Sequence, residues 1–218
     1  MISANYTWSH GLTDAQTDRS SAPQNSYNFH QGEYGPLQYD RRHVVSVTWV
    51  YELPFMRDQK GVIGKILGGW EGAGVITGET GLPLTVITSG IDTGGLGLLP
   101  GAASARPDAI CNPNEGSAGT RFQYFNTACF ATPPVGRPGN EGRGILCGPG
   151  FQRWDLSMSK NLRFGENMRL QIRGEATNLF NHTNPNALGT TQTTTSTFGT
   201  VTSYRDPRII QLGAKFYF

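Results

Sequence analysis

The end of the chain carries a two-faced pattern that few folds can accommodate. Apolar side chains occupy every second position there, at Ile210, Leu212, Ala214, Phe216 and Phe218, and the residues between them are polar, small or amphipathic. Such alternation predicts a strand with two unlike faces. The strand ends on an aromatic residue with no polar tail, and a membrane interface supplies the mixed apolar and wet boundary that such a residue prefers.

The same alternation occurs twice more upstream. Apolar residues alternate with polar ones from Trp154 to Phe164, where only Lys160 breaks the apolar side, and again from Met168 onward, where the opposite side is charged. Between the two runs, Gly165-Glu-Asn167 has the composition of a tight turn. The region 152–180 therefore predicts a β-hairpin.

Six such segments predict an all-β chain built as an antiparallel up-and-down meander. The expected strands lie near 2–8, 43–54, 70–87, 152–163, 168–180 and 208–218. The connections 9–42, 88–150 and 181–207 are long, whereas those between the other strands are short, and no stretch has sustained helical periodicity. Long loops on one side of a sheet and short turns on the other are typical of a transmembrane β-barrel, with the long loops external.

Composition narrows the function classes. The 218 residues are 37% hydrophobic and 16% charged, with 29 Gly and 13 Pro, which favours strands joined by irregular loops. A net charge of +2 gives no reason to expect nucleic acid as a partner. No apolar run has the length of a membrane-spanning helix. Motifs of enzymes and metal sites are missing, so we expect no catalysis, cofactor or metal.

About six strands are too few for closure, because the smallest single-chain barrels use about eight. An open sheet in lipid would leave unpaired backbone groups along two edges. We therefore expect the chain to be the C-terminal portion of a longer barrel, with Met1 an internal or mis-assigned start.

The alternation also assigns the faces of the strands. We expect Trp70 and Ile76 to point outward and Glu71 and Glu79 inward. Charged side chains expected to face the lumen are Asp155, Arg163, Arg169, Arg173, Glu175 and Lys215. Charges out of contact with bulk water need partners, so pairing with each other or with a plug is favoured over substrate binding.

Aromatic residues are expected to form girdles at both ends of the strands. Those toward the long loops are Trp8, Trp154 and Phe180, and those toward the turns are Phe55, Trp70, Phe164, Phe216 and Phe218. In the long loops, contact with a ligand and ordinary loop packing both remain open for Tyr34, Tyr39, Tyr124 and Phe125.

Three cysteines lie in one Gly/Pro-rich stretch, at Cys111, Cys129 and Cys147. Their spacing matches no zinc or redox motif. A disulfide, most simply between Cys111 and Cys129, would suit an oxidising exterior, although the thiols could equally stay unpaired. Cys147 has no predicted role.

A series of short motifs resembles the C-terminal barrel segment of TonB-dependent outer-membrane receptors, most closely the Oar-like group that carries a carboxypeptidase-regulatory-like domain. The motifs are Asn5-Tyr-Thr-Trp8, Asp40-Arg-Arg-His43, Tyr51-Glu-Leu-Pro-Phe55, Gly68-Gly-Trp70, Gly81-Leu-Pro-Leu84, Gly139-Asn-Glu-Gly-Arg143, Gly148-Pro-Gly150, Glu175-Ala-Thr-Asn-Leu-Phe-Asn-His182, Phe198-Gly199 and Arg205-Asp-Pro-Arg208. The resemblance implies a bacterial outer-membrane barrel of about twenty-two strands with a plug inside it. It also implies nutrient import driven through TonB, which would act through the plug, so this chain alone would not be competent for transport.

The resemblance extends to a C-terminal signal for the barrel-assembly machinery, matched by Gly213, Phe216 and Phe218. Leu212 departs from the pattern, which favours a polar residue at that position. An exposed edge strand with aromatic anchors can be captured by strand addition. The alternative is that these aromatic residues only face lipid.

Two other functions fit parts of the pattern. A soluble β-sandwich that binds carbohydrate or another ligand would pack the apolar faces of two sheets together. A hydrolase with its site in the loop 88–150 is less favoured, because no motif supports it.

Overall fold

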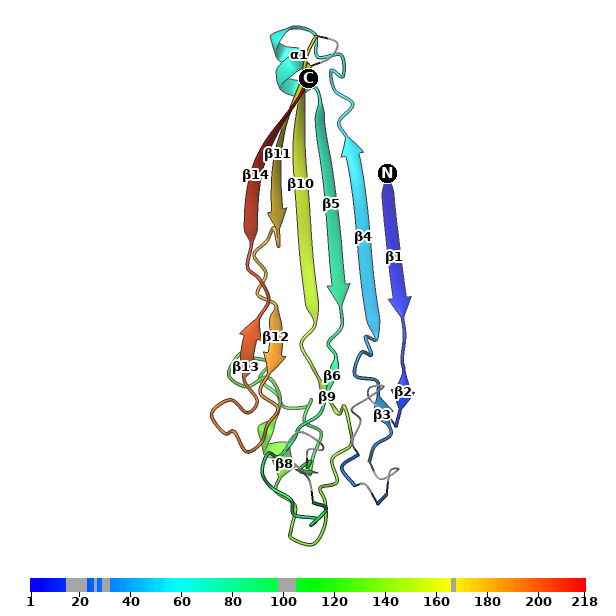
Figure 1. Ribbon diagram of the computed structural model, residues 1–218, viewed down its shortest axis with the longest axis vertical. Coiled ribbons are helices and arrows are strands. Elements are labelled where there is room, and N and C mark those ends of the chain that lie inside the picture. The colour runs from blue at the N-terminus through cyan, green and yellow to red at the C-terminus, as the bar shows by residue number, and fades with distance from the viewer. Residues whose placement is uncertain (15–22, 26, 29–31, 98–104, 166–167) are drawn as a thin grey trace.

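The computed structural model describes residues 1–14, 23–25, 27–28, 32–97, 105–165 and 168–218. Its main feature is one antiparallel sheet of six long strands, each paired with the next along the chain (Figure 1). The strands are β1 (Ile2–Trp8), β4 (His43–Glu52), β5 (Trp70–Glu79), β10 (Phe151–Phe164), β11 (Met168–Thr177) and β14 (Ile209–Tyr217). The prediction of an all-β meander is confirmed. Strand β5 ends eight residues earlier than the expected boundary at 87, and β11 ends three residues before 180.

Short strand pairs occur in the long connections, which the sequence predicted to be irregular. They are β2 (Leu12–Thr13) with β3 (Gly35–Pro36), β6 (Pro83–Leu84) with β9 (Leu146–Cys147), β7 (Asp108–Ala109) with β8 (Phe130–Ala131), and β12 (Pro185–Leu188) with β13 (Val201–Tyr204). A 3₁₀ turn, η1 (Thr127–Cys129), precedes β8. These pairs gather at one end of the long sheet (Figure 1).

The opposite end carries the helix α1 (Gly61–Leu67), within the β4–β5 connection. The sequence analysis found no sustained helical periodicity and did not identify this helix, because seven residues are too few to show a 3.6-residue period. In the described part of the chain, no helix is both long and apolar enough to cross a membrane. At the β10–β11 connection, Glu166 and Asn167 of the predicted turn lie outside the described residues.

The register of the sheet gives it two chemically different faces. One row of paired residues runs Trp49, Gly74, Leu156, Ala176 and Ile210 from β4 to β14, and it is apolar throughout. Directly paired residues share a face, and the next residue on each strand belongs to the other face. We call the side of this row the apolar face and the other side the polar face.

Trp49 makes the apolar face continuous across β4 and β5. Its indole lies over Gly72 and Gly74, where a Cβ atom added to Gly74 would lie 2.6 Å from the indole Nε1. A larger residue at Gly74 would therefore displace the ring. Trp70 and Ile76 lie on this same face and Glu71 on the polar face, as the register requires.

The buried apolar core lies among the loops and not within the sheet. Val86, Phe125, Cys129, Phe130 and Leu146 form it, and Phe198 packs against it. We call the described parts of the connections 9–42, 80–150 and 178–208 the loop module. The long sheet leaves both of its faces uncovered over most of their area, so it is a single layer (Figure 1).

Candidate functional site: the polar face and the loop module

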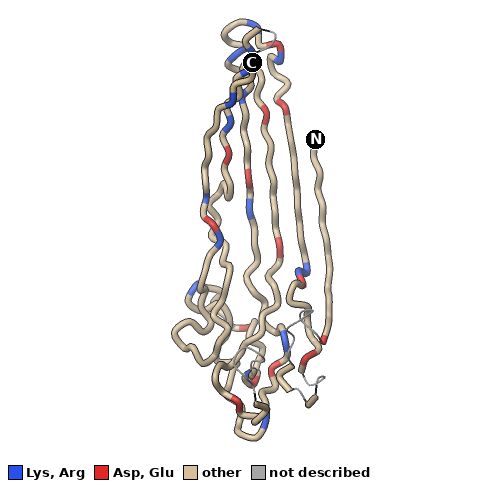
Figure 2. The backbone as a smooth tube through the Cα atoms, viewed as in Figure 1, with Lys and Arg blue, Asp and Glu red and all other residues tan. Residues whose placement is uncertain are grey.

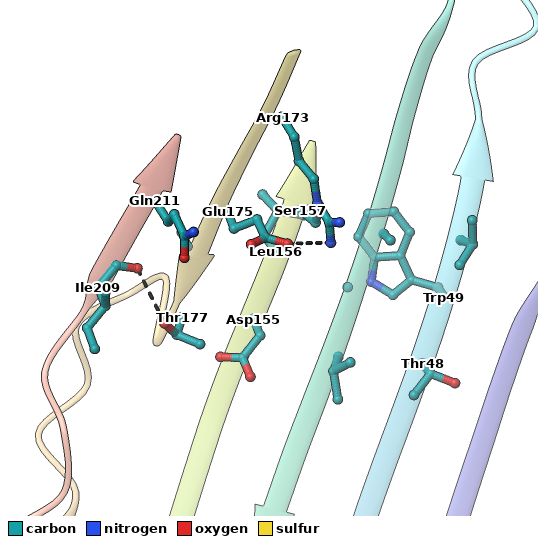
Figure 3. A pocket seen from close by; sticks show the side chains of 15 residues that line it. Thr48, Trp49, Asp155, Leu156, Ser157, Arg173, Glu175, Thr177, Ile209 and Gln211 are labelled. Carbon is teal, nitrogen blue, oxygen red and sulfur yellow. Dashed lines mark hydrogen bonds and ion pairs between the residues drawn. The ribbon is translucent and has the colours of Figure 1, made fainter. Parts of the chain in front are cut away.

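A cavity of about 430 Å³ lies against the polar face in the middle of the sheet. Its polar lining comes mainly from β10, β11 and β14 (Figure 3). Arg173 forms an ion pair with Glu175, and its Nε donates to Ser157 Oγ at 3.0 Å. The charges nearest the centre of the wall are thus paired within the chain.

The register places all six predicted lumenal charges on the polar face, namely Asp155, Arg163, Arg169, Arg173, Glu175 and Lys215. Asp155 pairs with Arg153 at 2.9 Å and accepts from the Asn178 backbone N–H at 3.0 Å. Glu79 of the same face pairs with Arg41 at 2.9 Å. Toward the loop module, the charges of the wall are therefore paired with residues of the wall or of the adjoining loops.

The turn end of the polar face differs, because like charges face each other there. Arg163 is directly opposite Arg169, and Glu52 is directly opposite Glu71. All four line a second cavity of about 430 Å³. In the part of the chain that the structure describes, none of the four makes an ion pair. Like charges directly opposite destabilise a strand pair, so this end of the wall is less well satisfied than the end at the loop module.

The aromatic residues follow the two ends of the apolar face. Trp154 contacts Phe180 edge-to-face with ring centroids 5.5 Å apart, at the loop end. At the turn end Phe216 stacks on Phe218 at 6.3 Å. Tyr217 points to the polar face, where Arg169 and Lys215 lie over its ring at 4.2 and 4.8 Å.

Strand β14, on an open edge, carries Gly213 and Phe216 of the predicted assembly signal, and Phe218 follows it directly. Phe216 and Phe218 are exposed, and a Cβ atom added at Gly213 would meet nothing within 4 Å. Nothing in the described chain requires a glycine at that position. Because Gly213 has no side chain, the backbone of another strand could approach the edge closely at this position.

The loop module contains a buried charge network that the sequence did not indicate. Arg106 Nη2 pairs with Glu33 Oε1 at 2.6 Å, and both side chains are buried. The Arg106 Nε and backbone N–H both donate to Gln24 Oε1, at 3.0 and 2.8 Å. Residues from two separate long connections are joined in this way.

The motif Gly139-Asn-Glu-Gly-Arg143 is a hub for the same loops. Asn140 Oδ1 accepts from the Ala109 backbone N–H at 2.8 Å, and Glu141 Oε1 accepts from that of Val86 at 2.9 Å. Arg143 donates to the Thr13 carbonyl at 2.5 Å. Burial raises the pKa of Glu141 to about 8, so this carboxyl is mostly protonated at neutral pH.

A disulfide joins Cys111 to Cys129, the pair named from the sequence, and Cys147 is an exposed free thiol. Phe125 is buried and contacts Phe130 and Phe198 edge-to-face, so its role is loop packing. Tyr124 packs against the same core. Tyr34 and Tyr39 are exposed.

Asp108 supplies another link. Arg137 donates to both of its carboxylate oxygens, at 2.7 and 2.6 Å, and this guanidinium holds the pKa of Asp108 below its usual value. The Asp108 carboxylate also accepts from the Asn140 backbone N–H at 3.0 Å. Ion pairs, the disulfide and an aromatic core therefore all act in the module that the sequence predicted as irregular loops.

A single-layered sheet with an apolar outside, aromatic ends and a polar inside defines the wall of a membrane β-barrel. The chain belongs to the family described as outer membrane beta barrel domain, whose sequence profile matches residues 1–211. Neither curated proteins nor solved structures gave a match. The chain is therefore part of a barrel wall in the bacterial outer membrane. The β-sandwich alternative was wrong, because no second sheet covers the apolar face in the described residues.

Proposed function

We propose that this chain is part of the barrel wall of a TonB-dependent outer-membrane transporter for nutrient uptake, of the Oar-like group. The observation that carries the proposal is the open six-stranded sheet, whose outer strands β1 and β14 each pair with a single neighbour among the described residues. Unpaired backbone groups cost several kcal/mol each in hydrocarbon, so further strands are needed at both edges. A larger barrel of this kind leaves an interior that a plug can fill.

The turn end of the polar face supports the plug. The opposed arginines Arg163 and Arg169 and the opposed carboxylates Glu52 and Glu71 make no ion pair among the described residues, and added countercharges would relieve the repulsion within each pair. A plug inside the barrel would bring such charges to the polar face. TonB would act through the plug, so it makes no contact with this chain in the proposal, and the chain by itself does not transport.

Insertion into the membrane would use strand β14. The proposal assigns Gly213, Phe216 and Phe218 to recognition by the barrel-assembly machinery, supported by the open edge and by the exposed aromatic rings. Main-chain pairing along such an edge gives affinity, and side chains give specificity. The proposal includes no catalytic step, no cofactor and no nucleic-acid partner.

The experiment is growth at limiting supply of single nutrients, using cells that produce the polypeptide containing this chain. A panel of siderophores, oligosaccharides and peptides covers the cargo classes that such receptors import. When the imported nutrient is the one in limiting supply, deletion of the gene and deletion of TonB should each abolish growth. Growth that needs the gene but not TonB would instead assign the chain to a passive barrel.

A further inference from the structure

The short helix α1 exposes most of its apolar side chains. Val62, Ile63, Ile66 and Leu67 are 75%, 64%, 61% and 52% exposed, so more than half of each side chain lacks a protein neighbour. Four large apolar residues within seven positions leave little of the helix surface polar. An exposed apolar group of this size marks an interaction surface.

The helix lies on the apolar side of the sheet. Trp70 Nε1 donates to the Ile66 carbonyl at 3.1 Å, and Lys160 Nζ donates to the same carbonyl at 2.9 Å. Lys160 also donates to the carbonyl of Gly68, and Lys65 Nζ lies 5.6 Å from the centre of the Phe164 ring. Trp70, Lys160 and Phe164 all belong to the apolar face.

These contacts satisfy the carbonyl groups at the end of the helix without water. The last turn of any helix leaves carbonyl groups without a hydrogen-bond donor in the helix, and water can donate to them where the helix end is exposed to solvent. Here a buried lysine and an indole from the sheet serve them instead. Hydrocarbon surroundings demand such internal partners. Lys160, which breaks the apolar alternation of its strand, therefore has a structural reason to be there.

Basic residues surround the same place. Lys60 precedes the helix and Lys65 lies in it, and Figure 2 shows Lys and Arg gathered at this end of the molecule. An amphipathic helix with basic neighbours is suited to the boundary between acyl chains and phosphate groups.

We infer that α1 binds the phospholipid leaflet at the turn end of the barrel, with its four apolar side chains among the acyl chains and Lys60 and Lys65 at the phosphates. The inference rests on the proposed function for the orientation of the barrel, which makes this leaflet the periplasmic one. The apolar residues of α1 continue the lipid-facing surface formed by Trp70, Phe164 and the other residues of the apolar face.

Other parts of a complete receptor are poorly placed to cover the helix. A plug occupies the polar side of the wall, and α1 is on the apolar side. Additional strands would join at the edges β1 and β14, whereas α1 contacts β5 and β10, which are the two central strands of the sheet. Lipid is the partner that meets the apolar face at its centre.

The experiment measures the depth of single fluorescent labels in vesicles of phosphatidylethanolamine and phosphatidylglycerol. The free thiol is removed by Cys147→Ser, and a nitrobenzoxadiazole label is placed at Ile66→Cys in the whole polypeptide. Val62→Cys serves if the first variant does not fold. Matched labels at Leu212→Cys, on the apolar face, and at Val135→Cys, an exposed residue of the loop module, report lipid and water.

We expect the label at 66 to shift its emission to the blue and to lose intensity with brominated lipids, as the label at 212 does, while the label at 135 does neither. Bromine near the headgroups should quench position 66 more than bromine deep in the chains. If position 212 is quenched and position 66 is not, the helix inference fails and the barrel stands. If neither is quenched, the membrane wall itself is wrong, and the inference falls with it.

Discussion

The wall and the loop module achieve their order by different means. The wall is one layer whose large apolar side chains, such as Ile172, Ile210 and Leu212, are exposed to the surroundings. The loop module buries its own aromatic core, its own ion pairs and a disulfide. The wall therefore depends on lipid as its solvent, whereas the loop module carries its stabilising contacts within itself.

This difference separates what each region tolerates. In the wall, a substitution matters according to which face it lies on, because one face meets lipid and the other the barrel interior. In the loop module, the effect of a substitution depends on which buried polar group loses its hydrogen-bond or ion-pair partner, because such groups there are satisfied by specific neighbours. Four predictions test this contrast.

The largest effect is expected from Arg106→Met in the loop module. Glu33 would keep a buried carboxylate whose ion pair is gone, and breaking such a pair costs about 3–5 kcal/mol. Hydrogen exchange at the Val86 amide should accelerate, while exchange in β10 stays slow. Arg121→Met removes an exposed guanidinium that lies over Phe122 in the same module and is the matched control. Equal exchange rates in the two variants would mean that the module does not depend on the buried pair.

The next effect is expected in the wall, from two neighbouring residues of β4. Val47→Lys puts a charge on the apolar face, where burial in the middle of the membrane costs about 2–4 kcal/mol. Ser46→Lys puts the same charge on the polar face and should be tolerated. Folded barrels resist SDS until they are heated, so the fraction of each variant that migrates as the folded species on unheated gels measures how well that variant folds. If both variants fold equally well, the assignment of the two faces is wrong.

The wall was predictable from sequence because a strand at a membrane repeats every two residues. Each side of the alternation could be assigned without knowing its partner, and β4, β10 and β14 lie where that pattern placed them. The alternation also identified the polar-face charges before any pairing was known. Lys160 was an anomaly in that pattern, because its partner is the helix in another connection.

The loop module was not predictable in the same way. Arg106 and Glu33 are 73 residues apart and carry no local pattern, so only the folded chain shows that they pair. Glu141 was visible only as one letter of the motif Gly139-Asn-Glu-Gly-Arg143, and its burial follows from loop segments distant in sequence that pack around it. Helix α1 was missed for a simpler reason, since its seven residues make only about two turns, which is too short to reveal a helical period.

The stability of the loop module should depend on pH through Glu141, and this effect is expected to be of intermediate size. The folded-state pKa of Glu141 is raised to about 8 from 4.5, so the folded module binds more protons than the unfolded one between those values. The module should lose stability as pH rises through this window, by about 3 kcal/mol between pH 5 and 8. Glu141→Gln mimics the protonated acid and keeps an oxygen for the Val86 N–H. Hydrogen exchange at Val86, corrected for its intrinsic pH dependence, should show the slope in the parent and lose it in the variant. A slope that survives the substitution would assign it to another group.

The smallest effect is expected at Lys160, where the wall, like the loop module, contains a buried polar side chain with specific partners. Lys160→Met keeps an unbranched side chain one atom shorter and removes the donor to the carbonyls of Ile66 and Gly68. Trp70 still serves the Ile66 carbonyl, so the loss should be that of a single partner, about 1–3 kcal/mol. The end of α1 should fray, which hydrogen exchange at the Gly68 amide reports through its bond to the Gly64 carbonyl. Lys215→Met, which removes an exposed lysine charge from the polar face, should leave that exchange unchanged. If the two variants exchange alike, water and not Lys160 serves these carbonyls, and the apolar face of the wall is wetter at the turn end than a lipid contact allows.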